Sequence, residues 1–169
     1  MKNKKIITVA IDSPAAAGAG KQAKLIAKNY NLFHLDTGKI YRYIGYLRLK
    51  QKEKFTYKFI QNKINLLKLK NLKDKKLLTD ETAISASIIA RDFKIRKIVH
   101  KFQQRCAYHP PKIYRGSVLD GRDIITIQVK DAMFKFFITA NVKIRAKRRY
   151  EEYKKLKRRI SYSDVLKSL

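Results

Sequence analysis

The sequence is poor in the residues that make covalent and metal cross-links. Its one cysteine, Cys106, excludes an internal disulfide framework and a cysteine-rich zinc site, and it favours a reducing cytosol. No histidine and acid stand beside Cys106 in a catalytic pattern, so we expect the thiol to be inert. The three histidines, His34, His100 and His109, lack metal-ligand spacing, and a metal cage of protein side chains is therefore not expected.

Long apolar runs are also missing. The apolar stretch that starts at Ile6 is interrupted by Asp12 after six residues, which is too short for the apolar region of a signal peptide. Lys135 breaks the apolar segment Phe134–Ile138, so no membrane span is predicted. We therefore expect a cytoplasmic protein without membrane contact.

Acidic residues are scarce, because 13 Asp and Glu stand against 41 Lys and Arg in a chain of 169 residues. The net charge of +28 makes nucleic acids, acidic membranes and nucleoside phosphates candidate partners. The alternative is a compositional bias of the source genome that fills solvated faces with lysine. Since the charge is spread evenly, it predicts only non-specific binding of nucleic acid. The length suits one well-cored domain.

Strand and helix patterns alternate along the chain, which predicts a parallel α/β sheet. We expect a central strand at 6–11, a short strand at 32–36, and two more buried strands at 117–120 and 134–140. The helical patterns cover 22–30, 40–50, 83–91, 95–106 and 143–157, with a cap at 79–82 before the third of them. The lysine-rich segment 51–80 predicts a small hairpin or an irregular insert.

Polar loops follow three of these strands, at 12–20, 36–39 and 120–123. In parallel sheets ligands bind beyond the carboxyl ends of the strands, so the three loops predict one site. The small residues of the first loop let backbone N–H groups converge on an anion at a helix N-terminus. The alternative is an ordinary tight turn, because the pattern G-x-x-x-x-G-K-[ST] is not met: Ala15 stands six residues before Lys21, and Gln22 follows it.

Several motifs together resemble cytidylate kinase, a P-loop nucleoside monophosphate kinase. The L-D-T-G-x-x-Y-R and D-G-R-D motifs are the most specific, and the likeness extends over nearly the whole chain. The blocks that carry it are Ile11–Ala15, Leu35–Arg42, Ser85–Ala90, Ile95–Arg96, Leu119–Ile124, Asp131–Ala140 and Arg145–Arg149.

The resemblance implies a P-loop NTPase-type sheet with flanking helices, an inserted NMP-binding region at 40–95 and the start of a lid at 150–169. It implies transfer of the γ-phosphate of ATP to CMP or dCMP by a monomer, with Mg²⁺ carried by ATP rather than by a cage of side chains. Arg42, Arg96 and Arg122 would hold the acceptor phosphate. Thr37, Ser87 and Asp123 would recognise the cytidine. The implied ATP site is Pro14, Ala15, Ala16, Ala17, Gly18, Ala19, Gly20, Lys21, Gln22 and Arg148, and the implied catalytic residues are Lys21, Arg122 and Asp123.

Each of these residues also has a simpler interpretation. Any one of the arginines, taken alone, could lie on a solvated surface, and Asp123 could form a salt bridge to a neighbouring Lys or Arg. Arg148 and Arg149 fit a plain basic helix face as well as a lid.

The chain departs from the family pattern at two places. Counted from Asp12 without a gap, the phosphate-bridging lysine position is Ala19 and the magnesium-binding Ser/Thr position is Lys21. Lys21 would then either reach back to the phosphates or face solvent. The chain also stops at Leu169, before the arginine-rich lid segment, the last strand and the last helix of the family.

These departures leave several functions open. The chain is either a full kinase seen as a truncated chain or a degenerate copy with little activity. A non-catalytic nucleotide-binding protein and a basic nucleic-acid-binding module are the alternatives from other classes.

Overall fold

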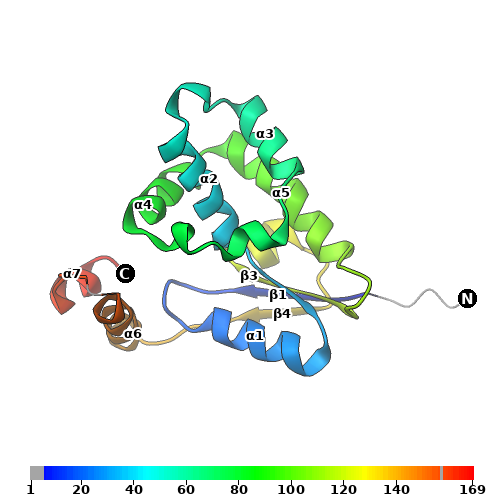
Figure 1. Cartoon of the computed structure of the whole chain (residues 1–169). Coiled ribbons are helices and arrows are strands. Elements are labelled where there is room, and N and C mark those ends of the chain that lie inside the picture. The colour runs from blue at the N-terminus through cyan, green and yellow to red at the C-terminus, as the bar shows by residue number, and fades with distance from the viewer. Residues whose placement is uncertain (1–5, 157) are drawn as a thin grey trace, which may run out of the picture.

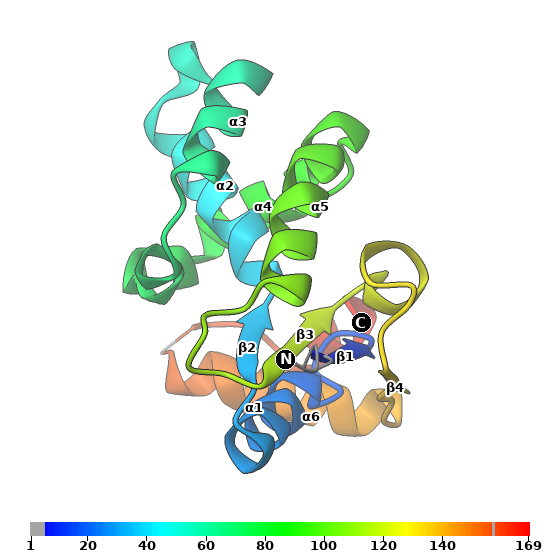
Figure 2. The same ribbon diagram turned by 90° about the vertical axis from the view of Figure 1, so that its right-hand side faces the viewer.

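The protein is built around a four-stranded parallel sheet with the strand order β2-β3-β1-β4 (Figure 2). A computed structural model describes residues 6–156 and 158–169. The strands are β1 (Ile7–Asp12), β2 (Phe33–Asp36), β3 (Gly116–Gly121) and β4 (Phe134–Phe137). The predicted parallel α/β sheet is thus confirmed.

Helices cover both faces of the sheet. On one face lies α1 (Ala19–Tyr30); on the other are α2 (Gly38–Lys50), α3 (Tyr57–Asn65), α4 (Asp80–Ile89) and α5 (Phe93–Tyr108) (Figure 1). α6 (Val142–Lys155) and α7 (Tyr162–Lys167) lie beyond the carboxyl ends of the strands, to the left in Figure 1. No helix within residues 6–156 and 158–169 combines the length and the apolar character needed to cross a membrane.

The β-branched run of β1 explains how both faces come to be covered. Val9 and Ile11 are buried in the apolar cluster between the sheet and α1. Ala10, which lies between them in the chain, belongs to the larger cluster on the opposite face, between the sheet and α2, α3 and α5. Alternate residues of a strand point to opposite faces, so a continuous apolar run suits a strand covered on both sides. Full burial of a side chain such as Ile11 contributes about 1.5–3 kcal/mol.

Side chains at the helix N-termini explain where the helices begin. The predicted cap is confirmed, because the Thr79 hydroxyl accepts the N–H of Thr82 at 3.3 Å. α5 begins two residues earlier than predicted, since Asp92 accepts the N–H groups of Lys94 at 2.8 Å and Ile95 at 3.1 Å. The apolar pattern, which begins at residue 95, does not include the capping residue Asp92 and therefore missed the first residues of the helix.

Of the two alternatives predicted for 51–80, the hairpin is wrong, and the irregular insert describes only the part outside α3. The segment contains α3 and three short 3₁₀ turns, at Lys52–Lys54, Leu69–Lys73 and Lys75–Leu78. The Thr56 hydroxyl caps α3 by accepting the N–H of Phe59, and Ile60 and Ile64 are buried one helical turn apart. This spacing of apolar residues is typical of a helix, but it was hard to recognise in a segment so rich in lysine.

The C-terminal third differs from prediction in three respects. The strand expected at 134–140 ends at Phe137 and is exposed along its length, with Phe137 70% exposed, because β1 is the one described element that packs closely against β4. A π-helical turn at Ile124–Gln128 and the helix α7 were not expected. α6 ends at Lys155; of the helix predicted to 157, residue 157 itself lies outside the described residues.

Candidate functional site

Three loops meet at the carboxyl edge of the sheet, as the sequence predicts. Parallel pairing brings the ends of β1, β2 and β3 to this one edge. The N–H of Ser13 donates to the carbonyl of Gly121 at 3.3 Å, and the N–H of Thr37 donates to the carbonyl of Asp120 at 3.0 Å. The loops after β1 and β2 are thus both tied to the end of β3.

The loop between β1 and α1, residues 13–18, is a turn of small residues with an unusual backbone. Gly18 has φ +103° and Ala16 has φ +60°, and both lie in the left-handed region. Among the described residues, nothing pairs with the N–H groups of Ala15, Ala16, Gly18, Ala19 and Gly20. Free N–H groups at the start of a helix form a binding site for anions, and phosphate is the usual ligand. We call residues 13–20 the phosphate loop.

The phosphate loop contains no cationic side chain. Ala19 is the first residue of α1 and is 5% exposed, packed in the apolar cluster that holds Val9 and Ala23. Lys21, two residues further along α1, is exposed. Any charge at the loop other than that of Lys21 must therefore come from another element.

Two arginines of α6 contact the backbone of the phosphate loop. Nη1 of Arg148 donates to the carbonyl of Ala17 at 2.8 Å, and Nη1 of Arg145 donates to the carbonyl of Ala15 at 3.2 Å. In a trans peptide the C=O and the next N–H point in opposite directions, so the N–H after each carbonyl points away from α6. Arg148 was predicted at the ATP site. Arg145 was not, although its spacing of three residues from Arg148 places both on one helix face.

Asp12 fixes the loop that follows β3. Its carboxylate is buried and accepts the N–H of Ile124 at 2.8 Å and the N–H of Ile125 at 3.1 Å. These two residues begin the π-helical turn, immediately after Asp123, which has φ +57°. The last residue of β1 therefore positions Asp123 at the edge of the sheet.

Arg96 and Asp123, both predicted in the CMP site, form an ion pair. Nη2 of Arg96 lies 2.6 Å from Oδ2 of Asp123, and Nη1 donates to the carbonyl of Ala90 at 3.3 Å. Tyr41 lies near the pair, and burial raises the pKa of its phenol. Arg122, next to Asp123, is exposed and makes no hydrogen bond or ion pair with any described residue.

Arg42 lies among several other charges. Its Nη1 donates to the carbonyl of Leu77 at 3.0 Å. Burial lowers the pKa of its guanidinium, and the nearby Arg149 lowers it further. Arg158 lies close by and pairs with Asp80. Sequence reasoning did not assign Arg158, because nothing local shows that the chain after α6 returns to the start of α4.

The hydroxyls of Thr37 and Ser87 are already bonded to the backbone. The Thr37 hydroxyl donates to the carbonyl of Asp120 at 2.9 Å and is buried, and a Cβ at residue 121 would collide with its oxygen, so Gly121 is required there. The Ser87 hydroxyl donates to the carbonyl of Ile84 at 2.8 Å on the exposed side of α4. Each oxygen retains lone pairs and can still accept a hydrogen bond from a ligand.

Two carboxylates face each other across the ends of β2 and β3. Asp36 is the register partner of Asp120, and burial together with the negative charge of Asp120 raises the pKa of Asp36. Oδ1 of Asp120 lies 2.5 Å from Nε2 of His34, whereas Oδ2 lies 3.5 Å from the position that a Cβ would take on Gly20. Oδ2 of Asp120 therefore offers a hard oxygen beside the phosphate loop, which suits Mg²⁺ bound mainly by phosphates. Within the described part of the chain, no three His, Cys, Asp or Glu side chains gather as a metal cage.

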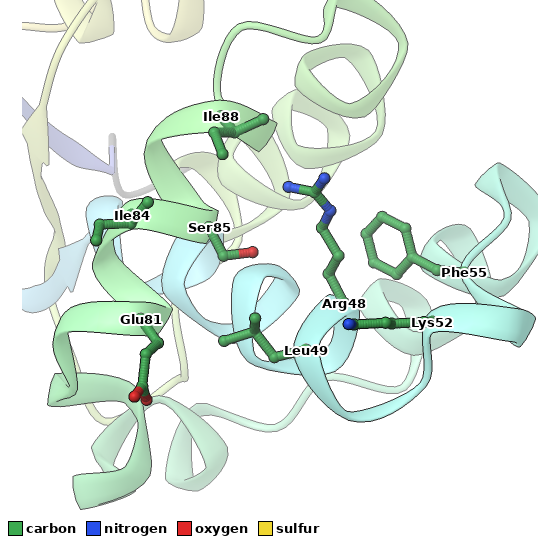
Figure 3. A pocket seen from close by; sticks show the side chains of 8 residues that line it. All are labelled: Arg48, Leu49, Lys52, Phe55, Glu81, Ile84, Ser85 and Ile88. Carbon is green, nitrogen blue, oxygen red and sulfur yellow. The ribbon is translucent and has the colours of Figure 1, made fainter.

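A separate pocket of about 540 Å³ lies between α4 and the C-terminal end of α2 with the turn that follows it (Figure 3). The guanidinium of Arg48 points into it beside the ring of Phe55. Its lining residues are Arg48, Leu49, Lys52, Phe55, Glu81, Ile84, Ser85 and Ile88. None of the predicted site residues lines this pocket, so it is not part of the candidate site.

Cys106 should be unreactive in the folded protein. Burial raises the pKa of its thiol to about 11, and only the thiolate is a nucleophile. At pH 8 about 0.1% of the thiol is ionised, and this fraction rises about tenfold with each pH unit until the pH nears the pKa. We expect iodoacetamide to modify Cys106 at least about tenfold more slowly than in the urea-unfolded chain, as followed by mass spectrometry. Equal rates in the two states would contradict the burial of this thiol.

The known proteins to which this chain is similar belong to one family. A family model described as cytidylate kinase matches residues 9–169. The cytidylate kinase of Bartonella tribocorum is 41% identical over 174 residues, which cover 98% of this chain and 75% of the relative. That of Rhodospirillum rubrum is 35% identical over 162 residues (95% and 76%), and that of Clostridium tetani is 34% identical over 178 residues (96% and 75%). The chain therefore belongs to the cytidylate kinase family.

Proposed function

We propose that this chain transfers the γ-phosphate of ATP to CMP or dCMP, giving CDP or dCDP. The observation that supports it most directly is the meeting of two kinds of group at one sheet edge. The free N–H groups of the phosphate loop and the Arg96–Asp123 pair both lie there, in a chain of the cytidylate kinase family. Phosphoryl transfer requires mainly positioning and positive charge around the moving group, and this edge offers both.

The phosphate loop binds the donor in this proposal. Its N–H groups bind the phosphates of ATP, and the positive end of the α1 dipole adds to their attraction. Oδ2 of Asp120, beside Gly20, would help to hold the Mg²⁺ carried by ATP, which would neutralise phosphate charge. Lys21 remains a candidate for a direct phosphate contact.

The acceptor binds on the side of α2, α4 and α5. Arg42, Arg96 and Arg122 bind its phosphate, because guanidinium groups match phosphate oxygens with two parallel hydrogen bonds and stay charged. Asp123 uses its free Oδ1 to accept the amino group of cytosine, the contact that carboxylates make with this base. Ser87 and Thr37 accept hydrogen bonds from the nucleoside.

A coupled assay with ATP, Mg²⁺ and either CMP, dCMP or UMP tests this function. We expect ADP formation to depend on CMP or dCMP and to be slower with UMP, whose base presents a carbonyl to Asp123. The Arg122→Ala variant, purified in the same way, controls for host kinases. ADP formation that does not depend on CMP or dCMP, or that is equal in this variant, would contradict the proposal.

The absence of a lysine at residue 19 supports a second candidate, a nucleotide-binding protein without catalysis. Calorimetric titration with ADP and CMP separates the two. Binding of both nucleotides without turnover would favour the second candidate.

We expect the protein to act as a monomer in the cytoplasm, where its single thiol stays reduced.

A further inference from the structure

We propose that the outer edge of β2 is a docking site for an extended acidic segment of another protein, which adds to the sheet as a further strand. In this mode of binding, main-chain hydrogen bonds supply affinity and alternate side chains supply specificity. Three features of the edge support it: backbone groups without partners, a groove beside them and the charge of that groove. Docking there does not depend on kinase activity.

The outer backbone groups of β2 have no partner among the described residues. β2 stands at one end of the strand order (Figure 2), and the N–H of Thr37, just after it, donates to the carbonyl of Asp120 in β3. Successive residues of a strand direct their N–H and C=O groups to opposite sides, so those of His34 and Asp36 point away from β3. Such unpaired groups are a template for another strand.

A groove of about 770 Å³ lies along this edge, and its lining includes every residue from Leu32 to Asp36. α1 borders the groove on one face of the sheet. The 3₁₀ turn Leu69–Lys73 borders it on the other face, where its leucines belong to the larger apolar cluster. We call this the edge groove. A strand added there places its alternate side chains against α1 and against the turn.

The charge of the edge groove favours an acidic partner. Its described lining contains four lysines and one carboxylate, that of Asp36, and none of these lysines forms an ion pair with a described residue. The four are Lys24, Lys28, Lys39 and Lys73. Lysines at a sheet edge repel other basic chains, and a second copy of this chain, with its net charge of +28, is therefore disfavoured.

The two sides of the edge groove define the sequence pattern of the segment that fits it. Lys24 and Lys28 lie one turn apart on α1 and offer ammonium groups on one side. Leu69 and Leu72 offer apolar surface on the other side. Because side chains alternate along a strand, the segment that fits carries acidic residues at every second position and apolar residues between them.

Fluorescence polarisation with a labelled peptide of about eight alternating Glu and Val residues tests this docking. We expect saturable binding to the full chain that weakens about tenfold in the double variant Lys24→Glu with Lys28→Glu. The control is Lys97→Glu with Lys101→Glu, because these exposed lysines have the same spacing on α5 and the change in net charge is equal. The control should bind the peptide as the wild type does.

N-methylated peptides separate strand pairing from simple attraction of charge. One peptide carries N-methyl groups on every Glu and another on every Val, and both keep the charge of the parent. Only one edge of the added strand faces β2, so one of the two peptides should bind about tenfold or more weakly, and the other should bind like the parent. Equal affinities of the two methylated peptides would overturn the proposal.

Amide hydrogen exchange, followed by NMR, locates the bound peptide. The N–H groups of His34 and Asp36 should exchange at least about tenfold more slowly in its presence. Binding without this protection, or an equal loss in the control with Lys97 and Lys101 replaced, would contradict docking at β2. A DNA oligonucleotide of equal charge that binds as tightly as the peptide and is lost in the same variant would also overturn the proposal. So would a dimer of the chain alone that the Lys24 and Lys28 replacements abolish.

Discussion

Alanine in place of Arg96 should lower kcat/KM for CMP about a hundredfold and leave the KM for ATP nearly unchanged. Arg96 is the only partner of the Asp123 carboxylate among the described residues, at 2.6 Å, and both belong to the proposed acceptor site. Its removal takes away a proposed phosphate ligand and leaves Asp123 without its counter-charge. A hundredfold loss in kcat/KM corresponds to about 2.7 kcal/mol of lost transition-state stabilisation.

Steady-state kinetics with each nucleotide varied in turn measures this effect. Arg105→Ala is the matched control, because Arg105 lies on the same helix, is exposed, and has its guanidinium over the ring of Phe102. Arg96→Lys should recover only part of the loss, since an ammonium group cannot make two parallel hydrogen bonds to phosphate. An unchanged KM and kcat for CMP in Arg96→Ala would remove this arginine from the acceptor site.

Alanine in place of Asp12 should lower the free energy of unfolding by about 3 kcal/mol. The change leaves the N–H groups of Ile124 and Ile125 without their acceptor, and each unsatisfied buried group costs about 1–3 kcal/mol. For a protein of this size, about 3 kcal/mol lowers Tm by about 10 °C. Activity should fall as well, because Asp123 directly precedes these two residues in the chain.

Thermal and urea unfolding followed by circular dichroism checks this result. Asp12→Asn should lose about half as much, because its side chain keeps one carbonyl oxygen as an acceptor. Glu151→Ala changes the net charge by the same amount at an exposed position and serves as the control. If Asp12→Ala were no less stable than Glu151→Ala, the two hydrogen bonds would not hold the loop.

The central strands and helices were predictable because their patterns are local. The apolar run before Asp12 and the cap at Thr79 each carry enough information within a few residues. The exposure of β4 was not predictable in this way. The apolar residues of 134–140 resemble those of β1, but β1 packs against α1 and the π-helical turn, whereas among the described elements β4 packs mainly against β1. Which elements cover a strand depends on the whole chain.

In the candidate site, too, local motifs were predictable and contacts between distant segments were not. The motif residues Arg96 and Asp123 are brought together by the fold, as their shared assignment to the CMP site leads one to expect. The contacts of Arg145 and Arg158 were not predictable, because each joins segments far apart in the sequence, as in the bond from Arg145 to Ala15. Residue type alone also did not reveal that the hydroxyls of Thr37 and Ser87 are bonded to backbone carbonyls.

The order of the strands has a consequence for the way in which the chain folds during synthesis. β1 pairs on one side with β3, where Ile7 meets Gly116, and on the other with β4, where Val9 meets Phe134. Its first partner thus leaves the ribosome about a hundred residues after β1 itself. Until then the apolar residues of β1 have no strand beside them. Closing such long segments of chain before any strand pair forms favours slow folding, and it leaves the apolar residues of β1 open to aggregation until β3 has been made.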